Sequence, residues 1–258
     1  MKKIIAMLLV LVMSVTGLVG CGSSKGNEAG STSASSDSDW AYIQDKGKLT
    51  VGITLFAPMN YYNEKNKLVG FDTEMAEAVT KKLGIDVEFT EINWDSKEVE
   101  LSSKNIDCIW NGFTMNGRED DYTWSDPYVD NSQVMVVSEN SGINSLSDLA
   151  GKTVGVQAAS AALDLLQSEE EGGQKELADT FAALQQFPDY NNAFVELQAG
   201  SIDAVAMDIG VAKYQLESRG EGYKILDEHL NSEKYAIGFK KGNTELCDKV
   251  NEGLQQVL

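Results

Sequence analysis

Histidine, cysteine and positive charge are all scarce in this chain of 258 residues. The single histidine, His229, argues against a Ser-His-Asp triad and against a histidine-ligated zinc site. The chain has 21 Lys and Arg residues against 40 Asp and Glu residues, which gives a formal net charge of −19. Because phosphate binding needs a basic face, we expect no nucleic-acid partner. Carboxylates, hydroxyls and one or two arginines must therefore carry the function.

The three cysteines, Cys21, Cys108 and Cys247, are widely separated and form no C-x-x-C pair, which excludes a zinc ribbon and a thioredoxin motif. Whether Cys108 and Cys247 pair depends on the fold, and buried free thiols are the favoured interpretation. The sequence also contains no G-x-G-x-x-G run, no G-x-x-x-x-G-K-[ST] run and no calcium-loop spacing. We therefore expect neither a cofactor nor a metal ion.

The first twenty residues have the three parts of an export signal: Lys2 and Lys3, an apolar stretch over residues 4–19, and small residues before Cys21. The apolar stretch is shorter than the ~20 residues that cross a bilayer, so a permanent transmembrane helix is the less favoured alternative. The run Leu18-Val19-Gly20-Cys21 is similar to a bacterial lipobox, in which the signal is cut before the cysteine and the thiol is acylated. The alternative is an ordinary cysteine in a signal that is cut elsewhere.

Residues 22–39 contain no apolar side chain larger than alanine, so they cannot build a core. We predict a signal peptide over residues 1–20 and a flexible tether over residues 21–39. Stable anchoring takes more than one acyl chain. The expected anchor is therefore a Cys21 that carries at least two chains, palmitate among them.

From residue 40 onward, strand-length apolar runs alternate with amphipathic stretches, which indicates an α/β fold with mostly parallel strands. The predicted strands are Leu49–Ile53, Val87–Thr90, Ile106–Trp110, Gln133–Val137, Thr153–Val156, Ala204–Met207 and Tyr235–Phe239. The predicted helices are Thr73–Leu83, Lys97–Ser103, Ala161–Gln167, Asn191–Ala199 and Val211–Ser218. Asp72 is expected to cap the first of these helices.

Several segments, in order and spacing, resemble the extracellular amino-acid-binding proteins that deliver to ABC transporters. They are Val51-Gly52-Ile53 with Phe56-Ala57-Pro58, Val69-Gly70-Phe71-Asp72, residues 106–114 with Arg118 and residues 124–128, Gly151 to Gln157, and Gly200 to Ala204 with Asp208. The resemblance spans nearly all of residues 49–258. It implies a two-lobed periplasmic-binding-protein fold (type II, Venus-flytrap) with two crossover strands and a ligand between the lobes.

Carried onto this sequence, the first lobe comprises residues 40–130 and 229–258, and the second lobe comprises residues 131–228. The crossings are expected at Tyr128 to Asn131 and at Asp227 to Asn231. The resemblance implies a monomer held outside the cytoplasm by its lipid anchor, with a free, polar amino acid and a transporter permease as partners. The sequence ends at Leu258 within a helical pattern, whereas relatives usually continue through another short helix, so an incomplete chain is one interpretation.

An amino acid carries a carboxylate and an ammonium, and burying either group requires a fixed partner of opposite charge. Arg118 is our candidate for the carboxylate, because its planar fork can form two parallel hydrogen bonds. The alternative is a surface pair with Glu119, Asp120 or Asp121. Asp208 follows a predicted strand and is assigned by the resemblance to the ammonium. The competing role for Asp208 is to cap the helix that follows it.

The resemblance adds five further residues to the expected binding site. Phe56 would cover the ligand, although a core phenylalanine is the alternative. Asn111 and Gly112 end a strand where a backbone carbonyl can accept from the ammonium. Thr114 offers a hydroxyl to the carboxylate, and Ser160 adds a hydroxyl and a helix N-terminal amide from the second lobe.

A ligand held by both lobes would stabilise their closed arrangement, which the transporter then recognises. Two other functions stay open at this stage. Some relatives with this fold are enzymes, such as a cyclic amino acid dehydratase, and the fold also serves as the sensing domain of receptors. Four large aromatic residues are interpreted as core rather than pocket: Tyr61, Trp94, Trp110 and Phe113.

Overall fold

The structure is a computed structural model, and it describes residues 38–258. The predicted signal peptide, Cys21 and all but the end of the predicted tether lie outside the described residues. Helix α1 (Asp39–Lys46) begins at the last residue of that tether, and the Ser38 hydroxyl caps it by accepting from the Ala41 amide at 3.2 Å. Within residues 38–258, no helix combines the length and the apolar character that a membrane crossing requires.

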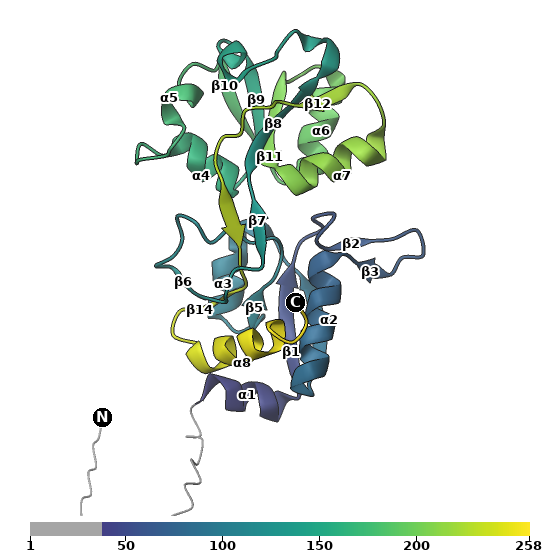
Figure 1. Ribbon diagram of the computed structural model, residues 1–258, viewed down its shortest axis with the longest axis vertical. Coiled ribbons are helices and arrows are strands. Elements are labelled where there is room, and N and C mark those ends of the chain that lie inside the picture. The colour runs from purple at the N-terminus through teal and green to yellow at the C-terminus, as the bar shows by residue number, and fades with distance from the viewer. Residues whose placement is uncertain (1–37) are drawn as a thin grey trace, which may run out of the picture. The chain divides into compact units, whose positions relative to one another are not determined.

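Two five-stranded sheets organise the chain (Figure 1). The first sheet has the order β4-β1-β5-β14-β6, formed by Asp86–Glu91, Lys48–Ile53, Cys108–Ile109, Gly238–Lys240 and Tyr122–Trp124. The second has the order β10-β9-β11-β8-β12, formed by Ala183–Phe187, Thr153–Gln157, Ala204–Asp208, Gln133–Ser138 and Tyr223–Ile225. We call each sheet with its helices the first lobe and the second lobe.

The strands are not mostly parallel, so that prediction is wrong. In the first sheet β1 runs parallel to β4 and β5, whereas β14 runs antiparallel to β5 and β6. In the second sheet β9 runs parallel to β10 and β11, whereas β8 runs antiparallel to β11 and β12. The antiparallel partners β8 and β14 are the strands by which the chain enters the second sheet and returns to the first, so they arrive from the opposite direction.

Helices cover both sheets and bury their apolar faces against them. In the first lobe α1, α2 (Phe71–Leu83) and α8 (Thr244–Leu254) close a core around Trp110, Phe239 and Val79, and α3 (Lys97–Ser102) packs on a second cluster through Leu101. In the second lobe they are α4 (Ala161–Gln167), α5 (Lys175–Ala178), α6 (Tyr190–Ala199) and α7 (Ile209–Arg219). Three short 3-10 turns also occur, at Trp94–Ser96, Glu139–Ser141 and Leu146–Leu149. The short strands β2 (Tyr61–Tyr62) and β3 (Leu68–Val69) pair with each other.

Two short antiparallel strands, β7 (Val129–Asn131) and β13 (Glu233–Tyr235), connect the two sheets (Figure 1). The first lies in the range predicted for a crossing, but the second begins two residues beyond the predicted Asp227 to Asn231. The predicted strand Tyr235–Phe239 is in fact divided between β13 and β14. Between these strands the Ala236 amide donates to the Phe113 carbonyl and the Ile237 amide to the Ser125 hydroxyl, so loops rather than a strand satisfy this backbone.

Cys108 lies in β5 and Cys247 in α8, and both are buried free thiols. Burial raises the pKa of the Cys247 thiol to about 12. The interpretation of these two cysteines as buried thiols rather than a disulfide is confirmed. They contribute to the core of the first lobe, where buried free cysteines behave as small apolar side chains.

Candidate functional site

All seven residues predicted for the site line one small cavity between the lobes. Its volume is about 20 Å³, which is room for about one water molecule. The predicted residues at this cavity are Phe56, Asn111, Gly112, Thr114, Arg118, Ser160 and Asp208. The sequence did not indicate the other five: Thr54, Trp94, Gln157, Ala161 and Tyr190. The structure therefore brings the predicted set together, while the binding role of each member stays a prediction.

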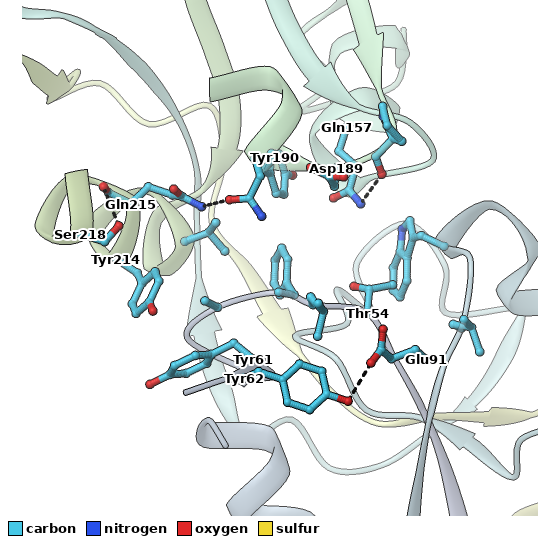
Figure 2. Close-up of a pocket in the computed structure, with 18 of the residues that line it drawn as sticks. Thr54, Tyr61, Tyr62, Glu91, Gln157, Asp189, Tyr190, Tyr214, Gln215 and Ser218 are labelled. Atoms are coloured by element: carbon cyan, nitrogen blue, oxygen red, sulfur yellow. Dashed lines mark hydrogen bonds between the residues drawn. The ribbon is translucent and has the colours of Figure 1, made fainter. Parts of the chain in front are cut away.

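A second pocket, of about 610 Å³, adjoins this cavity and shares five of its lining residues. Figure 2 shows Tyr61, Tyr62 and Glu91 on one side of the pocket and Gln157, Tyr190 and Gln215 on the other. Tyr61 belongs to β2 of the first lobe, and the ring of Tyr214, in α7 of the second lobe, packs against it in a tilted arrangement with ring centroids 5.4 Å apart. The predicted core placement of Tyr61 is therefore wrong, because its ring lines a pocket between the lobes.

Arg118 reaches across the gap between the lobes. Its Nη2 lies 2.6 Å from Oδ2 of Asp164 in α4, and its Nη1 donates to the Thr114 carbonyl at 3.2 Å. The Arg118 side chain is 11% exposed and that of Asp164 is 60% exposed. The alternative of a surface pair with the neighbouring acids is therefore wrong, since the partner belongs to the other lobe. A carboxylate already occupies the position at which Arg118 can bind one.

Asp208, at the carboxyl end of β11, is buried and surrounded by donors from four other elements. Its Oδ1 accepts from Asn131 Nδ2 at 2.7 Å, Gln133 Nε2 at 2.8 Å and the Tyr235 hydroxyl at 2.7 Å. Its Oδ2 accepts only from the Tyr190 hydroxyl, at 3.2 Å. The carboxylate makes no bond to the helix that follows, although Asp208 stands at the N-cap position of α7. Its role as a helix cap is thus wrong.

Glu233, on the crossover strand β13, is a second buried carboxylate beside Asp208. Its Oε1 accepts from the same two amide nitrogens, of Asn131 and Gln133, each at 2.7 Å. Burial, and after it the nearby negative charge of Glu233, raise the pKa of Asp208 to about 6. Burial also raises the pKa of Tyr190 and of Tyr235 well above the ordinary tyrosine value, so both hydroxyls remain donors.

The loop after β5 is held in place by Asp72, which contradicts the predicted capping role of that residue. Gly70 is the N-cap of α2 and makes no side-chain cap bond, whereas Oδ2 of Asp72 accepts from the Gly112 amide at 2.5 Å. Gly112 has a φ of 56°, and a Cβ there would lie 2.8 Å from the Phe56 ring. Both the conformation and the close contact therefore require glycine. Burial raises the pKa of Asp72 to about 7.

The remaining predicted side chains are already engaged within the protein. Asn111 accepts from the Thr54 amide and donates to its hydroxyl, both at 2.8 Å, and the Thr114 hydroxyl donates to Glu233 at 2.8 Å. Ser160 caps α4, because its hydroxyl accepts from the Leu163 amide at 3.2 Å. These contacts fix the wall of the cavity, and they leave fewer free hydroxyls than the resemblance implied.

Two aromatic side chains connect the lobes beside the charged groups. Phe56 is half-buried and packs against a cluster of buried apolar residues in the second lobe. The centroid of its ring lies 5.9 Å from that of Tyr190. Trp94 donates from Nε1 to the Ala159 carbonyl of the second lobe at 3.0 Å. The predictions of core placement hold for Trp110 and Phe113, which are fully buried, but not for Trp94. Apolar composition alone cannot distinguish a core ring from one that closes a cavity.

Comparison with known proteins identifies the family. Residues 49–258 match the bacterial extracellular solute-binding proteins, family 3. The L-cystine-binding protein TcyA of Bacillus subtilis is 32% identical over 262 residues, which cover 100% of this chain and 92% of that protein. The arginine-binding extracellular protein ArtP of the same organism is also 32% identical, covering 100% and 93%.

A solved structure gives the same result. The substrate-binding protein of an ABC uptake transporter from Streptococcus pneumoniae, with bound histidine, superimposes with a TM-score of 0.81 at 33% identity, covering 86% of this chain and 92% of that one. The two-lobed type II fold is thus shared along with the sequence. On these grounds the chain belongs to the bacterial extracellular solute-binding proteins, family 3.

Proposed function

We propose that this chain captures a free, polar amino acid between its two lobes and delivers it to the permease of an ABC transporter. The observation that carries the proposal is that Arg118 of the first lobe and Asp208 of the second lobe line the same cavity. A buried zwitterion needs one fixed cation and one fixed anion. The relatives' names and bound ligands, which are cystine, arginine and histidine, support an amino acid as that zwitterion.

At the carboxylate end, Arg118 would exchange one carboxylate for another. Its guanidinium now pairs with Asp164, whose side chain is mostly exposed and can move back into solvent. The fork of an arginine binds a carboxylate through two parallel hydrogen bonds. The α-carboxylate of an amino acid would therefore replace Asp164 with little loss, because Asp164 regains its hydration.

At the ammonium end, Oδ2 of Asp208 is the available acceptor, since Oδ1 already accepts from three donors. Phe56 borders the same cavity, so its ring face can add a cation–π attraction. The three hydrogens of an ammonium need further acceptors, and backbone carbonyls at Asn111 and Gly112 are our candidates.

Binding requires the lobes to separate and close again, because a cavity of about 20 Å³ is smaller than any amino acid. Contacts across the lobes, such as Trp94 to Ala159, must open to admit the ligand and form again around it. The side chain would extend into the adjoining pocket of about 610 Å³, whose wall includes Glu91, Asn191 and Tyr214. Those polar groups favour a polar side chain. Only a ligand that contacts the closed form better than the open form drives this closure.

We also propose that the protein acts as a monomer held outside the cytoplasm by lipid on Cys21. The support is the basic, apolar and small-residue pattern of residues 1–20 and the run Leu18-Val19-Gly20-Cys21. Labelling of cells with an alkyne analogue of palmitate tests the anchor. The wild-type chain should be labelled and retained in the membrane fraction, while Cys21→Ser should lose the label. Equal labelling of both chains would contradict the proposal.

Titration calorimetry of residues 38–258 with each of the twenty amino acids and L-cystine tests the central proposal. At least one member should bind at pH 7.5 with a dissociation constant in the micromolar range, on the order of −8 kcal/mol. Failure of every member to bind would overturn the proposal. The family is one of solute-binding proteins, which disfavours the enzyme alternative. Incubation with cyclic amino acids provides the corresponding check, since turnover would support an enzyme instead.

A further inference from the structure

Two buried carboxylates lie side by side where the lobes are connected, and only one of them lines the cavity. Asp208 Oδ1 and Glu233 Oε1 both accept hydrogen bonds from Asn131 Nδ2, each at 2.7 Å. Both also accept from Gln133 Nε2, at 2.8 and 2.7 Å. Two oxygens that accept hydrogen bonds from one nitrogen must lie within the sum of the two donor–acceptor distances of each other. The two carboxylates are therefore near neighbours. Two side-chain amides thus bridge the pair.

No cation within residues 38–258 forms an ion pair with either carboxylate. Arg118 borders the same cavity, but its guanidinium pairs with Asp164. Lys234 follows Glu233 on β13, but it is exposed and its nearest acid is the exposed Asp130, 3.9 Å away. The other titratable groups around the pair are Tyr190 from α6 and Tyr235 from β13, which donate as neutral hydroxyls.

Buried like charges with no counter-ion favour the uptake of a proton, because protonation removes both the repulsion and part of the desolvation cost. An amino acid supplies a positive charge to the same place, since its ammonium would bind Oδ2 of Asp208. A proton and an ammonium therefore compete for the pair. The hydrogen bonds from the side-chain amides of Asn131 and Gln133 do not neutralise the two negative charges, because an amide carries no net charge.

We propose that Glu233 is the second carboxylate of the ammonium subsite, and that binding of an amino acid displaces a proton held between Asp208 and Glu233. The inference rests on the proposed function and deepens it. The displaced proton leaves to solvent, and the ammonium of the amino acid takes over the neutralising charge. Glu233 is a positioning residue, because it acts through the shared amides of Asn131 and Gln133 and through its charge rather than by contact with the amino acid.

The sign of the pH dependence follows from Asp208. Its pKa in the free protein is raised to about 6 by burial and by Glu233. The ammonium favours the ionised carboxylate, so this pKa falls when an amino acid binds. Affinity should therefore be full above pH 6 and weaken as the pH falls below it, to about one tenth at pH 5. The number of protons released on binding should rise from about one half at pH 6 to nearly one at pH 5.

The experiment is titration calorimetry at pH 7.5 and pH 5, in buffers of different ionisation enthalpy, which count the protons released. The probe is the tightest-binding member of the amino-acid panel other than histidine, whose own side chain titrates in this range. For the wild type we expect about tenfold weaker binding at pH 5 than at pH 7.5, with release of nearly one proton at pH 5 and almost none at pH 7.5. For Glu233→Gln we expect weaker binding at pH 7.5 and a smaller ratio between the two pH values.

The matched control is Asp130→Asn, which removes one acid from the neighbouring crossover strand, where its side chain is 90% exposed. This variant should behave like the wild type at both pH values. A merely structural Glu233 would weaken binding equally at both, leaving the ratio unchanged, and that result would overturn the inference.

The wild type alone also decides the question if Glu233→Gln fails to fold. Tight binding without proton release and with equal affinity at pH 5 and pH 7.5 would refute the inference and leave the proposed function intact. Absence of binding by the whole panel at pH 7.5 would refute the proposed function and the inference with it. The two failures are therefore distinguishable.

Discussion

The two charged ends of the site are constructed in opposite ways. At the cationic end, Arg118 has one charged partner, Asp164, which is 60% exposed and belongs to the other lobe. At the anionic end, Asp208 accepts from four protein donors and lies beside a second buried carboxylate. The cationic end consists of an ion pair whose acid can be exchanged. The anionic end consists of a fixed hydrogen-bond network that includes residues of both crossover strands.

The difference indicates a division of roles. Arg118 can exchange its partner at small cost, because Asp164 is mostly exposed and regains its hydration while the carboxylate of the ligand takes its place. The network around Asp208 cannot rearrange so easily, because its donors and acceptors are buried and each would need a new partner. We therefore infer that the ammonium end is preformed, and that the carboxylate end is completed only when the lobes close on the ligand.

Removal of the guanidinium should have the largest effect on binding. Arg118→Ala leaves the carboxylate of the amino acid without its cation, which typically costs ~2 to 5 kcal/mol and weakens binding at least ~30-fold. Thermal unfolding should change little, because the ion pair that Arg118 makes within residues 38–258 is with an exposed acid. Calorimetry and a melting curve on the same preparation check both. Retained affinity would contradict the assignment of Arg118 to the carboxylate. The control is Lys241→Ala on the surface of the first lobe, which should bind like the wild type.

Asp72 is a buried carboxylate to compare with Asp208. Within residues 38–258 it accepts from the Gly112 amide and shares no donor with a second acid, whereas Asp208 shares two donors with Glu233. The pKa of Asp72, raised by burial to about 7, lies above the ~4 expected in the unfolded chain. The folded state therefore holds a proton that the unfolded state has lost, and stability falls as the pH rises from about 4 through 7. Asp72→Asn should remove this slope, about 3 kcal/mol between pH 4.5 and pH 8. Melting temperatures across that range measure it.

The exposed Asp45 of α1 provides the control for this prediction. Asp45→Asn should keep the pH slope of the wild type, because the side chain of Asp45 is exposed and the substitution leaves the buried Asp72 in place. Parallel slopes for Asp72→Asn and the wild type would show that the Asp72 carboxylate is not the source. In that case the repulsion of the remaining acids would have to account for any loss of stability at high pH.

Sequence reasoning predicted the residues that share a cavity better than the contacts they make. Asp208 was predicted because it follows an apolar strand, and Arg118 because the run that leads to it resembles the family; both line the cavity. Asp164 was missed, because it lies on the exposed face of a helix and gains a partner only when two distant segments meet. Asp72 was predicted as a cap, and nothing in its local sequence indicates the Gly112 amide as its partner.

Glu233 shows the same limit in the crossover. The predicted strand began at Tyr235, so the acid two residues earlier lay outside any expected element. Its neighbours in the network, Asn131 and Asp208, are separated from it by about a hundred and by twenty-five positions in the chain. Pairings of this kind depend on the register of β7 and β13, which apolar periodicity does not encode for strands of three residues.

The smallest expected effect concerns the exchangeable partner itself. If Asp164 competes with the carboxylate of the amino acid for Arg118, then Asp164→Asn should tighten binding, by about two- to fivefold on the scale of an exposed ion pair. Asp179→Asn is the matched control, because Asp179 also pairs with a cation on the surface of the second lobe, Lys175 at 2.7 Å, but lies away from the cavity. Calorimetry at low and high salt tests whether the change is electrostatic. If Asp164 competes through its charge, salt should reduce the difference in affinity between Asp164→Asn and the wild type. Weaker binding by Asp164→Asn would mean instead that Asp164 helps to hold the lobes closed around the ligand, so that the cationic end, like the anionic end, is a permanent part of the closed form.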